Sequence, residues 1–438
     1  MTKLIRGINL SQAVAINTID MVGIGPFVTI PFIMGAMPGW SCLIPWFLGA
    51  LLAFADGSVW AELGAKWPEA GGSYIFLQRL YSEIGKGRLM SFLYTWQTII
   101  QAPLVIASGA IGFSMYFNYL HPLSTFQEKA LSGLLVILVT FLLYRKITDI
   151  GKISLAFGAV VFTTILCIII SGFLHYSVNL PFHFESFSHQ NLADSGTKAI
   201  YCYLGYYNVC HLGGEIQNPE RNIPRSIFIS IAIIAVLYIL MQVAVMFVVP
   251  FPEAQNSKFI VSLFFEKLYG HRVAQIATGL ILLIAISSLF AVMLGYSRVP
   301  YAAAVDKNFF PVFGKLHPVK NFPHISLLAL GSVAFVFSLL FKMQDIITAI
   351  IAVRILIQFI AQGAGLIAYH RNHTTVTFPF RMWLYPLPAF TAIFIWLFIF
   401  SEASVWYIAA ALAIIATGLG LYWLKERSHG RTTAEQSN

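Results

Sequence analysis

The stretch Ala15-Ile-Asn-Thr-Ile-Asp-Met-Val-Gly-Ile-Gly-Pro-Phe27 decides how this chain folds, because it places helix breakers inside a long apolar run. Gly23, Gly25 and Pro26 fall together there. Proline removes a backbone donor, and glycine weakens a helix further. In hydrocarbon, unpaired backbone groups are tolerated only where they line a polar cavity. A lone proline would indicate a simple kink, whereas this cluster beside Asp20 favours a binding site.

The composition of the whole chain is that of a membrane protein. Of its 438 residues, 58% are hydrophobic and 10% are charged, and the mean hydropathy is +0.76. A typical soluble domain carries about a quarter charged residues. This excludes an ordinary soluble enzyme, a disordered protein and a nucleic-acid binder. The 4 cysteines lie in apolar stretches, which favours buried thiols over a disulfide or a metal site.

Apolar stretches long enough to cross a bilayer recur along the chain. A transmembrane helix needs about 20 mostly apolar residues. The candidate spans are 9–36, 40–65, 90–120, 130–147, 154–175, 196–216, 226–250, 272–296, 324–342, 345–369, 384–401 and 403–424. We therefore expect an all-α, polytopic membrane protein with 12 transmembrane helices and no separate soluble domain.

The basic residues orient these helices. With both termini cytoplasmic, 20 of the 27 Lys and Arg residues fall in inner segments, 6 fall in outer segments, and Arg354 lies within a span. Cytoplasmic loops are expected to hold such an excess. The net charge of +9 therefore indicates topology, and no basic patch remains for nucleic acid. Glu62 and Glu215 lie near inner helix ends among Lys and Arg, where we expect salt bridges.

The sixth span carries a second interruption. Residues Ile200-Tyr-Cys-Tyr-Leu-Gly-Tyr-Tyr-Asn-Val-Cys-His211 are aromatic and polar around Gly205. Spans one and six are the corresponding first helices of two five-helix halves. Interrupted spans at matching positions indicate a transport site at the bilayer midplane. Helix N-termini there attract an anion, and free carbonyls suit an ammonium group, so a site with both suits an α-amino acid.

Four motifs, in order along roughly residues 10–325, resemble those of amino acid permeases in the amino acid–polyamine–organocation (APC) superfamily. The first, Val22-Gly-Ile-Gly-Pro-Phe27, resembles the family's break in helix one. The others resemble the segments after helices two, six and eight. They are Ala61-Glu-Leu-Gly-Ala-Lys-Trp-Pro-Glu-Ala-Gly-Gly-Ser-Tyr74, Gly214-Glu-Ile-Gln-Asn-Pro-Glu-Arg-Asn-Ile-Pro-Arg225, and Ser297-Arg-Val-Pro-Tyr-Ala-Ala-Ala-Val-Asp-Lys-Asn-Phe-Phe-Pro311 followed by Lys315-Leu-His-Pro318.

This resemblance implies a five-plus-five inverted-repeat fold, as in the bacterial leucine transporter, with helices 1 and 6 broken. It also implies secondary active transport of amino acids across the cytoplasmic membrane by alternating access. The two repeats would be residues 9–175 and 196–370. A cytoplasmic N-terminus (1–8) would precede them, and two additional helices (382–424) and a cytoplasmic tail (425–438) would follow.

The resemblance further implies which residues meet the substrate. Amides around the first break would hold its carboxylate, carbonyls at both breaks would meet its amine, and Tyr201 stands where the family often has an aromatic gate. Apart from the resemblance, Gln97 and Gln101 lie four residues apart in helix three, and polar side chains in spans tend to face the bundle interior, so they would line the substrate path or form interhelical hydrogen bonds. The predicted substrate-binding residues are Asp20, Met21, Gly23, Ile24, Gly25, Tyr201, Leu204, Gly205 and Gln101.

Two charged residues lie roughly at mid-depth in the predicted spans. The family commonly has Asn where Asp20 stands, and a carboxylate inside the membrane indicates a function. Asp20 would bind a substrate amine, carry a coupled proton, or form a buried ion pair with Arg354 that locks helices one and ten. Arg354, Gln358 and Gln362 recur every four residues and so share one face of helix ten.

The coupling ion stays open among sodium, proton and uncoupled exchange. Ser287 and Ser288 carry hydroxyls of the kind that ligate sodium in sodium-coupled relatives, although such serines also bond their own helix. Many family members have a lysine in helix five, where this sequence has an apolar residue near Val161. The candidates for ion coupling are Asp20, Ser287, Ser288 and Arg354. We expect no cofactor beyond a coupling H⁺ or Na⁺, and no metal site.

Three functions fit these residues. The first is an amino acid permease. The second is a polyamine or cationic amine transporter selected by Asp20, and the third is a membrane sensor that binds amino acids without moving them. Short loops and the lack of an effector domain count against the sensor. No catalytic set of residues stands out, so we do not expect an enzyme. The sequence does not indicate the oligomeric state.

Overall fold

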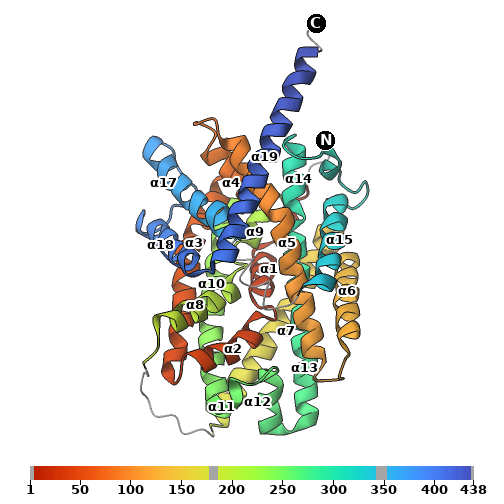
Figure 1. Ribbon diagram of the computed structural model, residues 1–438, viewed down its shortest axis with the longest axis vertical. Coiled ribbons are helices and arrows are strands. Elements are labelled where there is room, and N and C mark those ends of the chain that lie inside the picture. The colour runs from red at the N-terminus through yellow and green to blue at the C-terminus, as the bar shows by residue number, and fades with distance from the viewer. Residues whose placement is uncertain (1–3, 177–185, 342–352, 436–438) are drawn as a thin grey trace.

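The computed structural model describes residues 4–176, 186–341 and 353–435, and this part of the chain is helical with no strand beyond two isolated bridges. The helices form an elongated bundle, and both ends of the chain lie at its upper end in Figure 1. In chain order up to residue 203 the helices are α1 (Leu10–Met21), α2 (Gly25–Ala36), η1 (Trp40–Leu43), α3 (Ile44–Lys66), α4 (Ser73–Leu80), α5 (Gly87–Phe117), α6 (Thr125–Leu142), α7 (Ile147–Leu174) and α8 (His189–Tyr203).

The second part of the chain begins with short elements and continues with long helices. They are α9 (Asn208–His211), η2 (Gly213–Glu215), α10 (Pro219–Val248), α11 (Phe251–Ala254), α12 (Ile260–Tyr269), α13 (His271–Tyr296), α14 (Arg298–Val305), η3 (Pro311–Gly314), α15 (His324–Leu340), η4 (Ile355–Ala361), α17 (Gln362–Asn372), α18 (Leu387–Glu402) and α19 (Val405–Glu435).

The described helices fall on the apolar stretches that the sequence predicts. Among the described residues, 7 helices are long and apolar enough to cross a membrane, or 8 if the bent pair α1 and α2 forms one span. Helices α15 and α18 are shorter but also apolar. The sixth stretch corresponds to α8 and α9, and the tenth to η4 and α17, with residues 345–352 outside the described part. The count of twelve crossings and the inverted repeat stay predictions.

One predicted boundary is wrong. The sequence placed the end of span four at 147 and the start of span five at 154, but α6 ends at Leu142 and α7 already begins at Ile147. Asp149 lies in the first turn of α7, where a carboxylate favours helix formation by interacting with the helix dipole. The segment between α6 and α7 is bound by a residue from a distant part of the chain, because Lys320 Nζ donates to the Tyr144 carbonyl oxygen at 2.7 Å.

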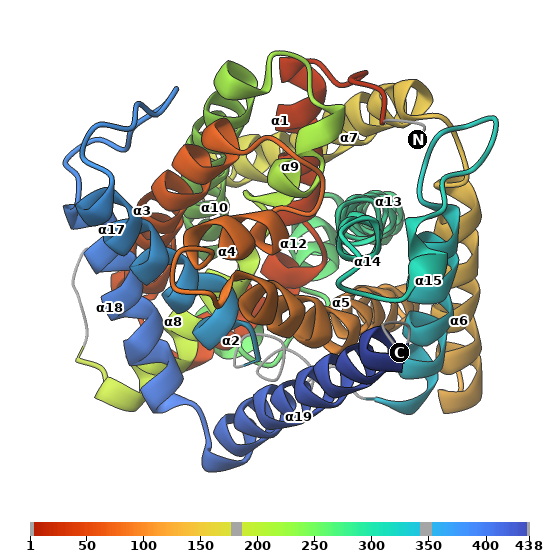
Figure 2. The same ribbon diagram turned by 90° about the horizontal axis from the view of Figure 1, so that it is seen from above.

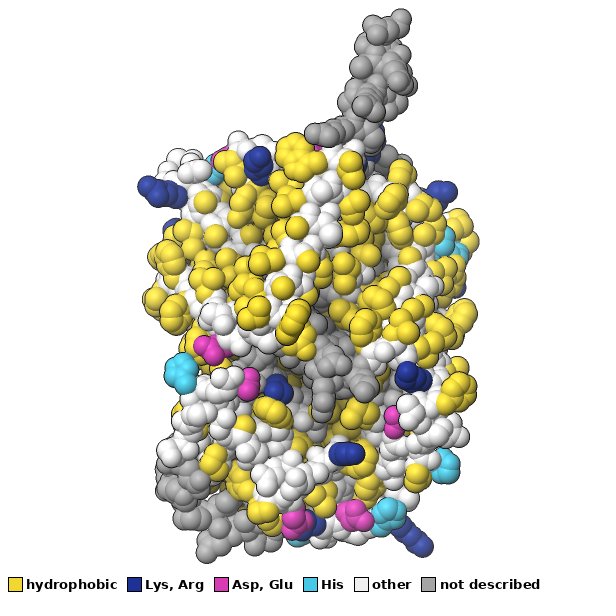
Figure 3. Space-filling view, in the orientation of Figure 1, with side chains coloured by type: hydrophobic (Ala, Val, Ile, Leu, Met, Phe, Trp, Pro, Cys, Tyr) yellow, Lys and Arg dark blue, Asp and Glu magenta, His cyan; other side chains and the backbone are white. Residues whose placement is uncertain are grey.

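The outer surface has the distribution of side chains that a bilayer requires. Figure 3 shows hydrophobic side chains covering much of the upper and middle part of one face, with Lys and Arg near the top and in the lower part. Large hydrophobic side chains far apart in the chain are exposed, such as Phe141 at 69% and Phe394 at 72%. Soluble proteins rarely expose apolar surface on this scale. Together with its long apolar helices, this surface makes the chain a multi-pass membrane protein.

The helices that position the interior come from distant parts of the chain. Helix α1 packs on α7, α10 and α13, while α3 packs on α8 and α10. Viewed from above in Figure 2, α19 runs along the outer edge against α5, and α4 and α9 lie further inward. The last helix therefore covers α5 from outside and leaves the opposite side of α5 facing the centre of the bundle.

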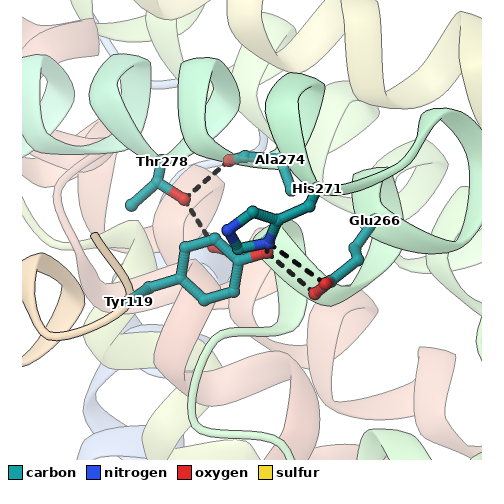
Figure 4. Close-up of polar contacts among 6 residues, drawn as sticks. Tyr119, Glu266, His271, Ala274 and Thr278 are labelled. Atoms are coloured by element: carbon teal, nitrogen blue, oxygen red, sulfur yellow. Dashed lines mark hydrogen bonds and ion pairs between the residues drawn. The ribbon is translucent and has the colours of Figure 1, made fainter. Parts of the chain in front are cut away.

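A polar network fastens the end of the bundle opposite the termini (Figure 4). The Tyr119 hydroxyl, just beyond α5, donates to Glu266 Oε2 on α12 at 2.8 Å. His271 Nδ1, at the start of α13, lies 3.2 Å from Glu266 Oε1. Further along α13, Thr278 Oγ1 donates to the Ala274 carbonyl oxygen at 2.7 Å. These contacts join α5, α12 and α13 at this end.

Candidate functional site

Two helix breaks touch each other inside the bundle. Helices α1 and α2 are bent by 46° across residues 22–24, and residues 204–207 separate α8 from α9. Gly205, in the second break, has a φ of +124°, which side chains rarely permit. A Cβ atom at Gly205 would lie 2.9 Å from the Asp20 carboxyl carbon and from the Met21 nitrogen. The close approach of the two breaks therefore requires glycine at this position.

Side chains from other helices hold the broken segments in place. The Tyr238 hydroxyl on α10 lies 2.8 Å from the Met21 carbonyl oxygen and 3.1 Å from that of Cys202, so it serves both breaks. The Val209 N–H donates to Asn17 Oδ1 at 3.0 Å. Backbone groups that the breaks would leave unpaired thus find side-chain partners, as a membrane interior demands.

The N-terminus of α2 presents free amides at the first break. The N–H groups of Gly23, Ile24 and Gly25 donate to no other described residue, as is usual for the start of a helix. Free amides and the positive end of the helix dipole together attract an anion. One carbonyl oxygen near this break already accepts a hydrogen bond, because Ser288 Oγ donates to the Asp20 carbonyl oxygen at 3.4 Å.

A cavity lies where the two breaks meet α5, α13 and η4. It collects eight of the nine residues predicted to bind substrate, and Gln101 lies outside its lining. The lining residues that the sequence predicted, including three of the four candidates for ion coupling, are Asp20, Met21, Gly23, Ile24, Gly25, Tyr201, Leu204, Gly205, Ser288 and Arg354.

Sequence reasoning missed several lining residues. Ser108 lies two turns beyond Gln101 on α5, and Tyr296 lies two turns beyond Ser288 on α13. Each therefore shares a helix face with a polar residue that the sequence analysis named. That spacing is a signal that the sequence contains. The apolar members carry no signal of their own. The missed residues are Val105, Ser108, Gly109, Cys202, Tyr207, Leu289, Val292 and Tyr296.

Arg354 reaches the cavity at the start of η4, a π-helical segment of the kind often found at functional sites. Its side chain is 2% exposed. Nη1 donates to the Tyr207 hydroxyl at 2.5 Å, and Nη2 donates to the Tyr296 hydroxyl at 2.6 Å. Both Arg354 and Asp20 line the cavity, but no ion pair joins them in the described part of the chain. The cavity lining therefore contains a carboxyl group and a guanidinium that do not form an ion pair with each other.

The two serines considered for ion coupling face different ways. Ser288 lines the cavity, whereas Ser287 Oγ donates to the Ile284 carbonyl oxygen of its own helix at 2.7 Å. Tyr201, the predicted gate, places its hydroxyl 3.1 Å from Ser108 Oγ. Its ring lies over Gly25, where a Cβ atom would be 3.2 Å from Cε1. The aromatic side chain of Tyr201 thus lies directly against the start of α2.

The two glutamates predicted near inner helix ends are both paired, but with different groups. Glu215 forms a two-pronged ion pair with Arg298, with both N···O distances at 2.8 Å, so the predicted salt bridge is confirmed. It is buried rather than exposed in a loop. Glu62 contacts His370 and accepts from the Met382 N–H at 3.0 Å. Its partner is thus a histidine instead of Lys or Arg.

Comparisons with known proteins cover most of the chain. A family model described as amino acid permease matches residues 8–420. Human cationic amino acid transporter 4 is 26% identical over 80% of this chain, which corresponds to 56% of its own length. In Bacillus subtilis, the glutamate/serine transporter AimA is 24% identical over 83% of this chain and 72% of its own. The branched-chain amino acid permease BcaP is 22% identical over 93% and 87%. The chain thus spans about half the length of the cationic amino acid transporter.

Proposed function

The chain belongs to the amino acid permease family of the APC superfamily, and from this premise we propose that it moves amino acids across the cytoplasmic membrane by alternating access. The matched family and relatives are membrane transporters and not enzymes. The observation that carries the proposal is the cavity at the two breaks, which is lined both by the residues with free amides at the start of α2 and by Asp20 with its carboxyl group.

The proposed substrate contacts follow the charges of an α-amino acid. Its carboxylate binds the free amides of Gly23, Ile24 and Gly25 at the start of α2, where the helix dipole adds to the attraction. Its ammonium group binds beside Asp20 and the carbonyl oxygen of Leu204. The ring of Tyr201 covers the bound substrate, as its place in the cavity lining supports.

The orientation and the coupling ion are part of the proposal. We place both termini on the cytoplasmic side, because 20 of 27 basic residues then fall on that side. Coupling to H⁺ would use the Asp20 carboxyl group, and coupling to Na⁺ would use oxygens of Asp20 and Ser288, which are ligands that hard cations prefer. Uptake measured with and without sodium, across a range of pH, separates the two ions.

Reconstitution into proteoliposomes tests the proposal. We expect saturable uptake or exchange of at least one labelled amino acid, and a strong loss of that uptake in Asp20→Asn. The matched control is Asp149→Asn, which changes an aspartate at the start of α7, away from the cavity lining, and should leave uptake intact. A complete lack of transport across a broad panel of amino acids and amines would contradict the proposal.

A cationic amine or polyamine is the second candidate substrate. It is favoured by the carboxyl group of Asp20 in the cavity and by relatives named cationic amino acid transporters. In this case Asp20→Asn should abolish binding of charged amines and spare neutral amino acids. Equal effects on both classes would count against it. Stabilisation by a ligand without any flux would instead favour a sensor.

A further inference from the structure

Three glutamines beside the cavity have side-chain amides with no partner. Gln97 and Gln101 lie on α5, Gln358 lies on η4, and each is at most 1% exposed. Within the described part of the chain, neither the nitrogen nor the oxygen of any of these amides makes a hydrogen bond. Buried polar groups are nearly always paired, and in a membrane the cost of leaving them unpaired is greater. Six unpaired atoms on two neighbouring helices need an explanation.

These three glutamines, here called the ladder, lie on two helices that both contribute to the cavity lining or begin beside it. Helices α5 and η4 are in contact. On α5, Val105 lines the cavity, Gln101 lies one turn earlier in the helix, and Gln97 lies one turn before Gln101. On η4, Gln358 follows Arg354 by about one turn. The ladder therefore runs from the Arg354 end of the cavity toward α4 and α17, at the end of the bundle that holds the termini (Figure 1).

Polar side chains continue the ladder beyond the glutamines. Tyr94 lies one turn before Gln97 on α5, and its hydroxyl is 3.0 Å from His211 Nε2. One turn further, Ser91 Oγ accepts from Asn308 Nδ2 at 3.1 Å. Asn308 lines a wide groove at that end of the bundle, together with residues of α5, α14 and α19. Buried polar groups thus connect the cavity to a surface groove.

Other unpaired atoms lie along the same route. On the α17 side, Gln362 Oε1 accepts from Ser73 Oγ at 2.5 Å while its amide nitrogen has no partner among the described residues. Arg354 Nε and His211 Nδ1 are likewise without a partner in this part of the chain. The polar groups that lack partners are therefore spread along the whole route and not confined to one point.

The chemistry of these groups selects the ligand. Each glutamine amide offers both an acceptor oxygen and a donor nitrogen. An anion would leave the three oxygens unpaired, and a metal cation would leave the nitrogens unpaired and lie beside the guanidinium of Arg354. Water both donates and accepts, and a buried water typically makes about three hydrogen bonds. Water is the ligand that satisfies both kinds of atom.

We propose that the interface of α5 and η4 holds a file of ordered water molecules, bound by Gln97, Gln101 and Gln358, that joins the Arg354 end of the cavity to the groove at Asn308. The file hydrates the cavity from one side of the membrane while Tyr201 and the helix breaks keep their packed positions. It goes beyond the proposed function, because it does not depend on which substrate is moved or whether one is moved.

Radiolytic hydroxyl-radical labelling of the unmodified protein tests the file directly, because radicals formed from bound water react with adjacent side chains. Tyr94 and Tyr116 are both on α5 and both at most 1% exposed, but only Tyr94 lies on the ladder. Tyr116 donates to the Phe27 carbonyl oxygen at 3.0 Å at the other end of α5. We expect Tyr94 to be labelled several times faster than Tyr116. Equal, slow labelling of the two would overturn the proposal.

Gln101→Met and Gln358→Met test whether the glutamines bind the water. Methionine matches glutamine in length, so each variant removes the amide with little change in side-chain size, and the direction of the change in melting temperature is the result to be read. A dry, unpaired amide is unfavourable, so its removal would raise the melting temperature, whereas a hydrated amide loses its water contacts and the melting temperature falls. We expect a fall. Gln242→Met is the calibration, because Gln242 Oε1 accepts from Trp46 Nε1 at 3.0 Å and its loss is destabilising in either case. A rise for both ladder variants would overturn the assignment. Should either variant fail to fold, the labelling of the unmodified protein still decides.

Discussion

Arg298 and Arg354 are both buried, each 2% exposed, but they are held in opposite ways. Arg298, at the start of α14, meets the carboxylate of Glu215 through two hydrogen bonds of 2.8 Å. Arg354 donates only to the hydroxyls of Tyr207 and Tyr296 among the described residues. A carboxylate neutralises a buried guanidinium, whereas a phenol binds it without cancelling its charge. The positive charge of Arg354 therefore stays available to the cavity.

The location of each arginine agrees with this difference. Glu215 ends η2, the segment that follows the second helix break, so its ion pair fixes that segment to α14. Arg354 lies on the cavity lining together with Asp20. We infer that Arg298 has a structural role, and that Arg354 keeps a charge that a substrate or Asp20 meets during transport. Three predictions test this contrast.

The largest effect is expected for Glu215→Gln. The substitution leaves the guanidinium of Arg298 buried without a carboxylate, and breaking a buried ion pair in this way costs about 3–5 kcal/mol. Unfolding in detergent or lipid nanodiscs measures the loss. The matched control is Glu69→Gln, which breaks the exposed pair with Arg79, where both side chains are at least half exposed and the cost is about 1 kcal/mol or less. Similar losses in the two variants would contradict a structural role for Arg298.

The second prediction concerns Arg354→Gln. The variant loses two hydrogen bonds to phenols, but it also removes a poorly compensated buried charge, so the free energy of unfolding should fall by only about 1–2 kcal/mol. Substrate binding and transport should nevertheless be lost or strongly reduced. Paired measurements of unfolding and of uptake in proteoliposomes test both statements. Uptake that stays normal, or destabilisation as large as in Glu215→Gln, would assign Arg354 to the fold instead.

The sequence predicted the helix breaks because these breaks depend on the backbone properties of a few neighbouring residues. Glycine and proline within an apolar run restrict the helix wherever the rest of the chain lies, so Gly23 and Gly205 were identified without any knowledge of packing. The resemblance to the family then implied which residues between 20 and 25 meet the substrate, and these residues line the cavity. Helix boundaries were less certain, as α7 shows, because the capping of a helix depends on a few residues at its end.

Side chains that converge from different helices could not be assigned from one sequence. Ser287 and Ser288 are neighbours with the same chemistry, yet only Ser288 lines the cavity, because successive residues on a helix face about 100° apart. Glu62 finds its partner His370 more than 300 residues away in the chain. The two tyrosines that hold Arg354 come from the second break and from the end of α13. Such pairings depend on how the helices pack, and composition and spacing do not encode that packing.

The smallest effect is expected for Tyr296→Phe, which removes one of the two hydroxyls that accept from Arg354. The loss of one such hydrogen bond should cost about 0.5–1.5 kcal/mol and weaken substrate binding modestly. A double-mutant cycle is more informative than the single variant. The stability effects of substitutions at residues in contact are not additive, whereas those at distant residues add. In the Arg354→Gln background, Tyr296→Phe should have almost no further effect on the free energy of unfolding, because the hydrogen bond that it removes is already lost.

Tyr116→Phe provides the control for this cycle. It removes a buried hydroxyl that donates to the Phe27 carbonyl oxygen and that makes no contact with Arg354. Its effect on stability should add to that of Arg354→Gln, with an interaction energy close to zero. If Tyr296→Phe is as additive as Tyr116→Phe, the phenol does not position the guanidinium, and the contrast between the two buried arginines then rests on Glu215 alone. If only Tyr296→Phe couples, the tyrosines hold Arg354 in place while leaving its charge for the cavity.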